Sequence, residues 1–475
     1  MILSISWKNI WRNKVRSLVV IIAITIGLFG AVFGVALMNG MILQRADEMI
    51  KNNISHIQIH HPEFRNNFKS EFTIPDLDEL EQKLENTEIV KGYASRVKTM
   101  AMGTNSYGSV GVIINAINPE QEKNVTEIYK SIVDSSGTYF EADKENSVLI
   151  SSILAKKMKI VQFEITDNTI EELRKRKMSE ENIDKLSTIK DELFRKEKDF
   201  NLKIEELIGE EQFEIYEKVI SDLSIKFKLR SKIIFKFQNA EGEMIDELFK
   251  VVGVYKTSNA LYDQMNVFVR KDYFVKISKI APNTAHEIAI ILDSEKDIDN
   301  KTAQIQALAP DMEVLNFFDT DPMMEMTVKW AQIYYYILVI IILFALGFGI
   351  VNTMLMVVLE RVKELGMLMA IGMNKTKVFL MIMLESVFLS LIGGVIGMIL
   401  GALSTWQLGI NGWDISQYSE GMEAVGYSSV IYPSLTVDFL VGTTILVILT
   451  GIISAIYPAR KALKLNPADA IRSDA

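Results

Sequence analysis

Few side chains in this 475-residue chain have the types and spacing that catalysis requires. The four histidines, His56, His60, His61 and His286, do not form an H-E-x-x-H pattern or a comparable metal-ligand spacing. His60 and His61 are adjacent at a predicted strand end, where successive side chains point to opposite faces, so we do not expect them to share a metal. The chain has no cysteine, which excludes disulfides and thiolate metal sites.

The sequence also lacks a nucleotide-binding loop. The pattern G-x-x-x-x-G-K-[ST], whose glycines and lysine cradle phosphates, does not occur. We therefore expect a chain that is not an enzyme, that holds no cofactor or metal of its own and that does not bind nucleic acid.

Four long apolar runs must position whatever chemistry the chain has. They lie at 18–38, 333–359, 378–403 and 439–457, and each can cross a hydrocarbon core of ~30 Å with ~20 helical residues. The only charge within them is Glu385. Glu385 could pair with a basic residue ahead of the first run, such as Arg12 or Arg16, or it could be a proton or substrate site.

Lysine and arginine counts beside the runs predict their orientation. Four basic residues precede the first run, four lie in 360–377 and four follow the last run, whereas 406–435 has none. Both termini and the 360–377 connector are therefore expected in the cytoplasm, with the chain in the inner membrane.

The fold class that follows is a membrane protein with four transmembrane α-helices and a large extracytoplasmic α+β domain between helices 1 and 2. The long segment must fold because it far exceeds an unstructured loop. It contains strand patterns such as "SHIQIHH" and "VGVIINAI", and 232–237 and 248–254 read as strands joined near Glu241–Gly242. The predicted segments are an amphipathic cytoplasmic helix at 1–17, spans at 18–40, 331–359, 378–405 and 437–457, a periplasmic domain at 41–330, a coupling segment at 360–377, a periplasmic loop at 406–436 and a cytoplasmic tail at 458–475.

A densely charged segment at about 163–230 differs from the rest of the domain. Leu186, Leu193, Phe200 and Leu207 recur every seven residues, which indicates one narrow apolar seam on a long polar helix followed by a return helix. We expect a helical hairpin inserted into the domain. It is either a solvated surface or a docking element.

The connector "ERVKELGMLMAIGM" followed by "VFLMIMLES" resembles the signature of FtsX-like ABC transporter permeases. "SWKNIWRNKVRS" and "YPARKALKLNPADAIR" resemble the amino- and carboxy-terminal segments of that family. The resemblance implies a coupling helix that receives the motion of a separate ABC ATPase dimer, which binds the ATP and Mg²⁺. The coupling residues it implies are Glu360, Arg361, Lys363, Glu364, Leu365, Gly366, Met367 and Gly372, and it favours a structural role for Glu385.

Within the family, "ALMNGM" at 36–41 and "VVGVYKTSNALYDQMNVFV" resemble the lipoprotein-releasing LolC/LolE-type permeases. This resemblance implies mechanotransmission with a second permease subunit, identical or a sister, and release of lipoproteins to a LolA-like periplasmic carrier. The alternatives are MacB-like efflux or peptide export and FtsX-like regulation of cell-wall hydrolases. Because the connection "QNAEGEMIDEL" is short, the carrier-binding hook is short or missing, and the inserted hairpin could replace it.

The resemblance also suggests candidate site residues. Those for an acyl cavity, which could equally face membrane lipid, are Phe29, Phe33, Met38, Tyr334, Tyr335 and Tyr336. The candidate docking residues are Leu186, Leu193, Phe200, Glu241 and Gly242.

Overall fold

The computed structural model describes residues 2–140, 145–416, 421–422 and 427–463. It divides into two compact units. The first, which we call the helix unit, comprises 1–46, 323–419 and 428–475. The second, the sheet unit, comprises 47–322 and 420–427.

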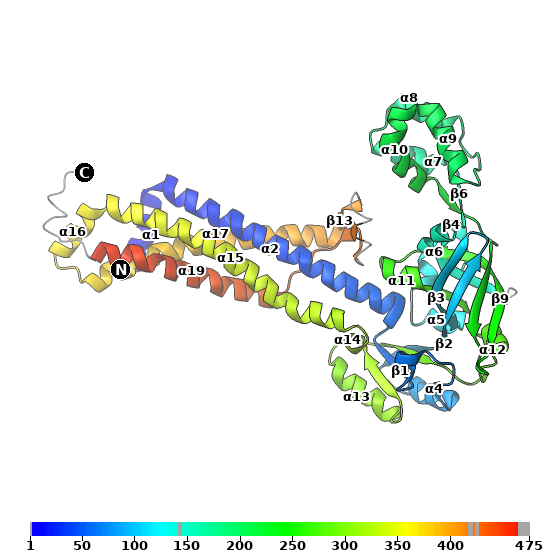
Figure 1. Cartoon of the computed structure of the whole chain (residues 1–475). Coiled ribbons are helices and arrows are strands. Elements are labelled where there is room, and N and C mark those ends of the chain that lie inside the picture. Colours follow the sequence, from blue (N-terminus) through cyan, green and yellow to red (C-terminus); the bar gives the residue numbers. More distant parts are fainter. Residues whose placement is uncertain (1, 141–144, 417–420, 423–426, 464–475) are drawn as a thin grey trace. The chain divides into compact units, whose positions relative to one another are not determined.

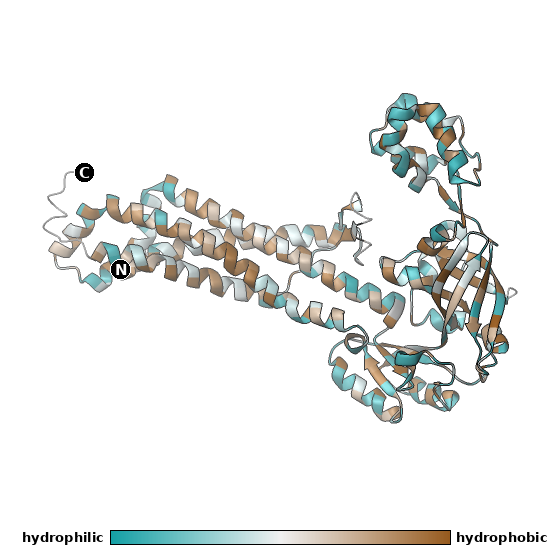
Figure 2. Cartoon of the chain, viewed as in Figure 1, coloured by the Kyte–Doolittle hydropathy of each residue, from teal (hydrophilic) through white to brown (hydrophobic). Residues whose placement is uncertain are grey.

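Four helices of the helix unit are long and apolar enough to cross a membrane, which confirms the predicted spans. They run side by side in Figure 1 and are mostly brown, that is apolar, in Figure 2. Each helix contains one predicted run and extends beyond it. The helices of this unit are α1 (Ile2–Arg12), α2 (Lys14–Met49), α15 (Pro322–Glu360), α16 (Val362–Ala370), α17 (Lys375–Asn411) and α19 (Val437–Leu463), with a small ladder of β13 (Trp413–Asp414) and β14 (Val430–Ile431).

Glycines on α17 bring its backbone close to α2. A methyl group added at Gly393 would lie 2.9 Å from the carbonyl oxygen of Ile21, and one at Gly397 would lie 2.7 Å from that of Thr25. Small residues at such positions let helices in a membrane approach closely. On another side of α17, the hydroxyl of Ser386 donates to the carbonyl of Gly451 in α19 at 3.2 Å. The close packing of α17 between α2 and α19 therefore depends on small residues.

The sheet unit is built on one ten-stranded mixed sheet, as the predicted α+β class requires. The strand order is β12-β1-β11-β2-β3-β10-β5-β9-β4, and β8 pairs with β2 and β9. Its strands are β1 (Ile57–His60), β2 (Val90–Asn105), β3 (Gly108–Ile117), β4 (Ile132–Gly137), β5 (Ser147–Ser151), β8 (Lys232–Gln238), β9 (Met244–Tyr255), β10 (Asn266–Arg270), β11 (Glu287–Leu292) and β12 (Glu313–Asn316). The shorter helices of the unit are η1 (Ile50–Ile54, a π-helix), α3 (Phe64–Asn67), α4 (Leu77–Glu85), α5 (Pro119–Glu122), η2 (Ile128–Lys130), α6 (Ser152–Lys157), α11 (Ala260–Met265), α12 (Lys271–Ser278), α13 (Ile298–Leu308) and α14 (Phe317–Thr320).

Strand β2 is long because it serves two parts of the sheet. Residues 90–96 pair with β11, and residues 97–105 pair with β3. Arg96 stands at the changeover, directly opposite Glu287 of β11. The changeover therefore places a buried guanidinium where the two parts of the sheet meet.

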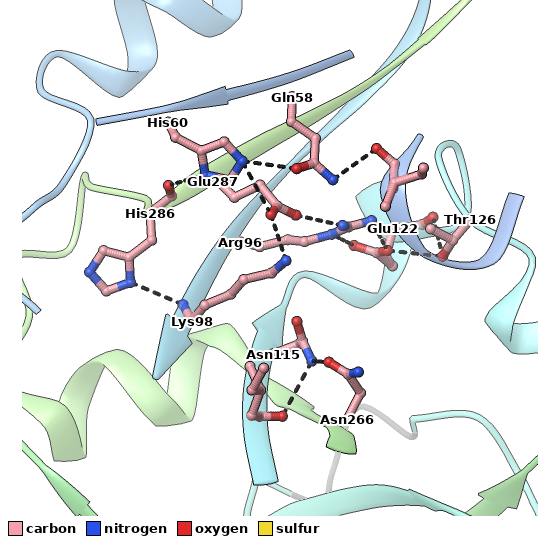
Figure 3. Close-up of polar contacts among 12 residues, drawn as sticks. Gln58, His60, Arg96, Lys98, Asn115, Glu122, Thr126, Asn266, His286 and Glu287 are labelled. Carbon is pink, nitrogen blue, oxygen red and sulfur yellow. Dashed lines mark hydrogen bonds and ion pairs between the residues drawn. The ribbon is translucent and has the colours of Figure 1, made fainter. Parts of the chain in front are cut away.

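The guanidinium of Arg96 forms ion pairs and hydrogen bonds within a buried network of charged and polar groups (Figure 3). Arg96 bonds Glu122 of α5 at 2.7 Å and Glu287 at 2.6 Å, and Lys98 bonds Glu287 at 2.5 Å. Burial opposes ionisation of Glu287, but Lys98 and Arg96 outweigh it and lower the pKa of this carboxyl group. Because both carboxylates are paired, the network adds no uncompensated charge to the interior.

Two histidines border this network and are neutral at pH 7. Burial lowers the pKa of His60 to about 4 and that of His286 to about 4. His60 contacts the side chain of Gln58 at 2.9 Å, and the backbone amide of Lys98 donates to Nδ1 of His286 at 3.0 Å. No group of three or more His, Cys, Asp or Glu side chains suited to a metal ion occurs in the part of the chain that the structure describes.

The insertion is not the helical hairpin that the seven-residue period predicts. Between the paired strands β6 (Val161–Phe163) and β7 (Ile225–Phe227) it forms four helices, α7 (Asp167–Lys175), α8 (Glu180–Ser187), α9 (Glu197–Ile208) and α10 (Glu210–Leu223). The long helix breaks because Phe194 exchanges backbone hydrogen bonds with Phe163 at 2.8 Å, and because Gly209 adopts φ +82° between α9 and α10. Leu186 and Phe200 lie in the separate core of these helices, whose ribbons combine hydrophilic (teal) and hydrophobic (brown) residues in Figure 2.

Candidate coupling site

Arginine and glutamate side chains from five helices gather at one end of the helix unit. They surround a cavity of about 260 Å³ that also reaches Asn9 and Asn13. The connector between α15 and α17, including α16, lies at this end of the bundle in Figure 1. The charged members are Arg12 of α1, Arg16 of α2, Glu360 of α15, Arg361 and Glu364 at α16, and Glu385 of α17.

Two ion pairs tie the amino-terminal helices to the connector. Arg12 donates two hydrogen bonds to Glu364, at 2.8 and 2.6 Å, and Arg16 donates two to Glu360. Burial opposes ionisation of Glu364, but hydrogen bonds from Arg12 and Arg361 outweigh it and lower its pKa. Arg12 and Glu364 are about half exposed, so this pair contributes at most ~1 kcal/mol to stability. Both hydrogen bonds come from the same nitrogen, Nη2 of Arg12, which lies between the two carboxylate oxygens of Glu364.

Glu385 is buried and lies at the centre of the cluster. It accepts a hydrogen bond from Asn9 at 2.6 Å and from Arg361 at 3.2 Å. The alternative in which Glu385 pairs with Arg12 or Arg16 is wrong in its choice of partner, because those arginines bond Glu364 and Glu360 instead. Arg361, which is also 3.1 Å from Glu364, is the basic partner. The sequence could not reveal this partner, since only the fold back at 361 brings the two residues together.

Helix α16 turns one face inward and exposes the other to the surface. Leu365 and Gly366 are buried against the bundle, whereas Met367 is 55% and Ile371 78% exposed. Lys363 and Gly372, which ends the turn with φ +101°, also lie on the surface. Of the predicted coupling residues, Leu365 and Gly366 therefore hold α16 in place and cannot form a docking surface.

The candidate acyl-cavity residues have different surroundings in the part of the chain that the structure describes. Phe29 and Phe33 stack on α2, with ring centroids 5.9 Å apart. Met38 and Tyr334 are exposed, and Tyr335 is buried beside a different cavity of about 100 Å³, which Tyr336 also lines.

An apolar cavity of about 440 Å³ lies elsewhere, between α15 and α19. Phe344 and Phe348 form part of its wall and contact each other with perpendicular rings, with Ser454 on the opposite side. Sequence reasoning missed these phenylalanines, although their spacing of four places them on one helix face.

The candidate docking residues of the sheet unit have different surroundings. Leu186 and Phe200 are fully buried, so the proposal that they dock a carrier is wrong, whereas Leu193 is 47% exposed. Glu241 pairs with Lys279, and Gly242 adopts φ +83° in the turn between β8 and β9.

Comparisons with known proteins identify the class to which these elements belong. Residues 336–467 match the family model of the FtsX-like permease C-terminal domain, and residues 17–170 match that of the MacB-like periplasmic core domain. The chain thus contains an FtsX-like permease C-terminal domain and a MacB-like periplasmic core domain.

Among curated proteins, the chain is 27% identical over 242 residues to the uncharacterized ABC transporter permease MJ1507 of Methanocaldococcus jannaschii, covering 48% of this chain and 56% of that one. It is 34% identical over 149 residues to the macrolide export ATP-binding/permease protein MacB of Escherichia coli strain K12, covering 31% of this chain and 20% of that one. The matches therefore span about half and one fifth of these relatives.

Solved structures add little to this assignment. The periplasmic region of MacB from Actinobacillus actinomycetemcomitans aligns with 57% of this chain and 92% of its own, at 9% identity and a TM-score of 0.29. The extracellular domain of the transporter YknZ from Gram-positive bacteria aligns with 55% of this chain and 99% of its own, at 12% identity and a TM-score of 0.27. The assignment rests on the sequence matches.

Proposed function

We propose that this permease works by mechanotransmission with an ABC ATPase dimer carried on other chains and with a second permease subunit. ATP binds to the ATPase, whose closure moves α16, and α16 passes the movement to the spans. The observation that supports this most directly is the set of bonds from Arg361 and Glu364 at α16 to Glu385 of α17 and Arg12 of α1. Through these bonds a displacement of α16 would act on α17 and α1. In this proposal the protein lies in the inner membrane with both termini and α16 in the cytoplasm.

The exposed face of α16 provides the test of this coupling. Met367→Asp and Ile371→Asp place a charge on the free surface without touching the buried face, so the permease should fold but bind its ATPase poorly. Transport-linked ATP hydrolysis in proteoliposomes should fall at least about tenfold, as for loss of a central interface contact. Thr376→Asp, exposed at the start of α17, is the matched control. Unchanged hydrolysis and transport in both α16 variants would reject α16 as the docking surface, and ATP hydrolysis by the permease alone would reject a separate ATPase.

For the cargo, we propose an acylated protein that enters from the outer leaflet. The sequence "ALMNGM" resembles lipoprotein-releasing permeases, and the apolar cavity between α15 and α19 is large enough for part of an acyl chain. A photo-crosslinking residue at Phe348 should capture an acylated protein, while one at the lipid-facing control position Ile399 should not. Removal of the acyl chains from the cargo should abolish the crosslink.

Export of the MacB type is the second candidate, because the MacB-like match at 17–170 and the MacB relative both favour it. In that case a non-acylated peptide or small molecule should stimulate ATP hydrolysis, and Phe348 should capture no acylated protein. A third possibility that the FtsX-like match leaves open is regulation of a cell-wall hydrolase.

A LolA-like carrier, where one participates, would dock on surfaces other than the buried Leu186 and Phe200. Because Phe163 and Ile225 are directly paired, a short Gly-Ser linker can replace residues 164–224. If the insertion docks the carrier, this replacement should abolish carrier binding while ATP hydrolysis persists. If carrier binding persists, the exposed turn at Glu241 becomes the next surface to test.

A further inference from the structure

The sheet unit contains a cavity of about 550 Å³ that the proposed transport function does not use. Its wall includes α4, the middle of β2, the start of α5 and the first turns of α12. A volume between ~300 and 1,000 Å³ is typical of sites for small molecules. The ionisable groups on the wall decide which kind of molecule fits.

Lys271 and Glu81 are bridged across this wall by one hydroxyl group. Nζ of Lys271 donates to Oγ of the buried Ser95 at 2.8 Å, and the Ser95 hydroxyl is hydrogen-bonded to the Glu81 carboxylate. No ion pair within 4 Å involves Lys271 or Glu81 among the residues that the structure describes. Both charges therefore lack a counterion in contact.

Burial acts on both groups. It lowers the pKa of Lys271 and raises that of Glu81, which means that each charged form is poorly solvated. Other charged groups on the rim have partners of their own, since Arg270 pairs with Asp272 at 2.8 Å, Lys276 pairs with Glu145 at 3.5 Å, and Asp78 accepts a hydrogen bond from the neutral amide of Asn283 at 2.9 Å. The ammonium of Lys271 and the carboxylate of Glu81 are the groups that a ligand would complement.

We infer that this cavity binds a zwitterion of the α-amino-acid type, with its carboxylate on Lys271 and its ammonium on Glu81. Because both groups bond one hydroxyl, they are no more than about 6 Å apart, which suits a ligand whose two charges are joined through a single carbon. The volume leaves room for a ligand side chain. A free amino acid and the serine headgroup of a phospholipid share this chemistry.

The test uses the full chain in detergent micelles and measures thermal stabilisation and heat of binding. L-Glutamine represents a free amino acid, glycerophosphoserine the headgroup, and acetate and methylammonium each supply half of the zwitterion. At least one zwitterion should bind at millimolar concentration, and each half should bind at least about tenfold more weakly, the loss expected for one charge-assisted hydrogen bond. Which zwitterion binds identifies the source.

Lys271→Met and Glu81→Gln should each weaken zwitterion binding at least about tenfold. Lys279→Met, which removes an exposed lysine outside the cavity, is the control and should bind as the unaltered chain does. The double exchange Glu81→Lys with Lys271→Glu rebuilds the pair in reverse and should restore binding, which separates loss of the site from loss of folding. Absence of binding by both zwitterions, equal binding of the halves, or full binding by the two single variants would overturn the inference.

Discussion

Arg361 is the residue on which the coupling site depends most, because it bonds carboxylates on two helices. Its side chain is 14% exposed and that of Glu385 is 5% exposed. Arg361→Met leaves Glu385 buried without its basic partner, and breaking a buried pair in this way costs ~3–5 kcal/mol. We expect a lower midpoint of thermal unfolding for the full chain in micelles.

The companion substitution tests the reason for that loss. Adding Glu385→Gln to Arg361→Met removes the unpaired charge and should recover part of the stability, whereas the exposed control Lys377→Gln should change little. Glu385→Gln alone completes the comparison. If the double variant loses as much stability as Arg361→Met and Glu385→Gln lose when their separate effects are added, the two residues are not coupled.

The buried histidines predict how stability changes with pH. Burial holds the pKa of His286 at about 4 in the folded chain, against ~6.5 in an unfolded one, so the unfolded state binds more protons between these values. The free energy of unfolding is therefore not reduced by His286 above pH ~6.5. It decreases as the pH falls toward 4, by up to ~3 kcal/mol for this residue. His60 contributes in the same direction.

Urea unfolding of the full chain at several pH values between 7 and 4 measures this slope. His286→Gln removes one titrating group and should flatten the dependence, while His61→Gln, which keeps both buried histidines His60 and His286, is the control and should leave it unchanged. An equal slope in the His286 variant would show that other groups cause the pH dependence.

The close packing of α17 against α2 in the helix unit can be tested by substituting glycines. Gly397→Ala would place a methyl group 2.7 Å from the carbonyl oxygen of Thr25, and a backbone atom cannot move aside without separating α17 from α2. We expect a clear loss of thermal stability. Gly30→Ala is the matched control on α2, because nothing lies within 4 Å of the added methyl group, and it should be neutral or stabilising by up to ~1 kcal/mol. Equal effects of the two substitutions would contradict the close α2–α17 packing.

The elements differ in how far the sequence predicts them. The spans follow from apolar runs longer than 18 residues, and β8 follows from the apolar residues at every second position of "KIIFKFQ", Ile233, Phe235 and Phe237, which the structure buries. For the insertion, hydrophobic periodicity gave a wrong prediction of one long helix. Leu186, Leu193 and Phe200 keep a seven-residue period although they lie on different elements. A period predicts one helix only while the backbone stays helical, and the Phe163–Phe194 hydrogen bonds interrupt it.

The sequence predicts which charged residues belong to the coupling site, but it does not predict which of them form ion pairs with each other. The sequence indicates that Glu385 needs a basic partner and that 360–377 carries exposed charges. It does not tell Arg361 from Arg12 or Arg16, because contacts between residues 24 and 376 positions apart depend on the tertiary fold. For the same reason the cavity formed by Glu81, Ser95 and Lys271 has no local signal in the sequence.

The orientation of the whole molecule is the last prediction, and the absence of cysteine makes it simple to test. The basic residues in 360–377 and beside both termini predict that α16 faces the cytoplasm, and 406–435, which lacks Lys and Arg, faces outward. Single cysteines at Ser187 and Ser428 should react with an impermeant maleimide in intact spheroplasts, whereas one at Lys375 should react only after lysis. Ser187 and Lys375 are both exposed, so protection of Lys375 would reflect its side of the membrane rather than burial. Reaction at all three positions in intact spheroplasts would contradict the four-span arrangement, and α16 could then not meet a cytoplasmic ATPase.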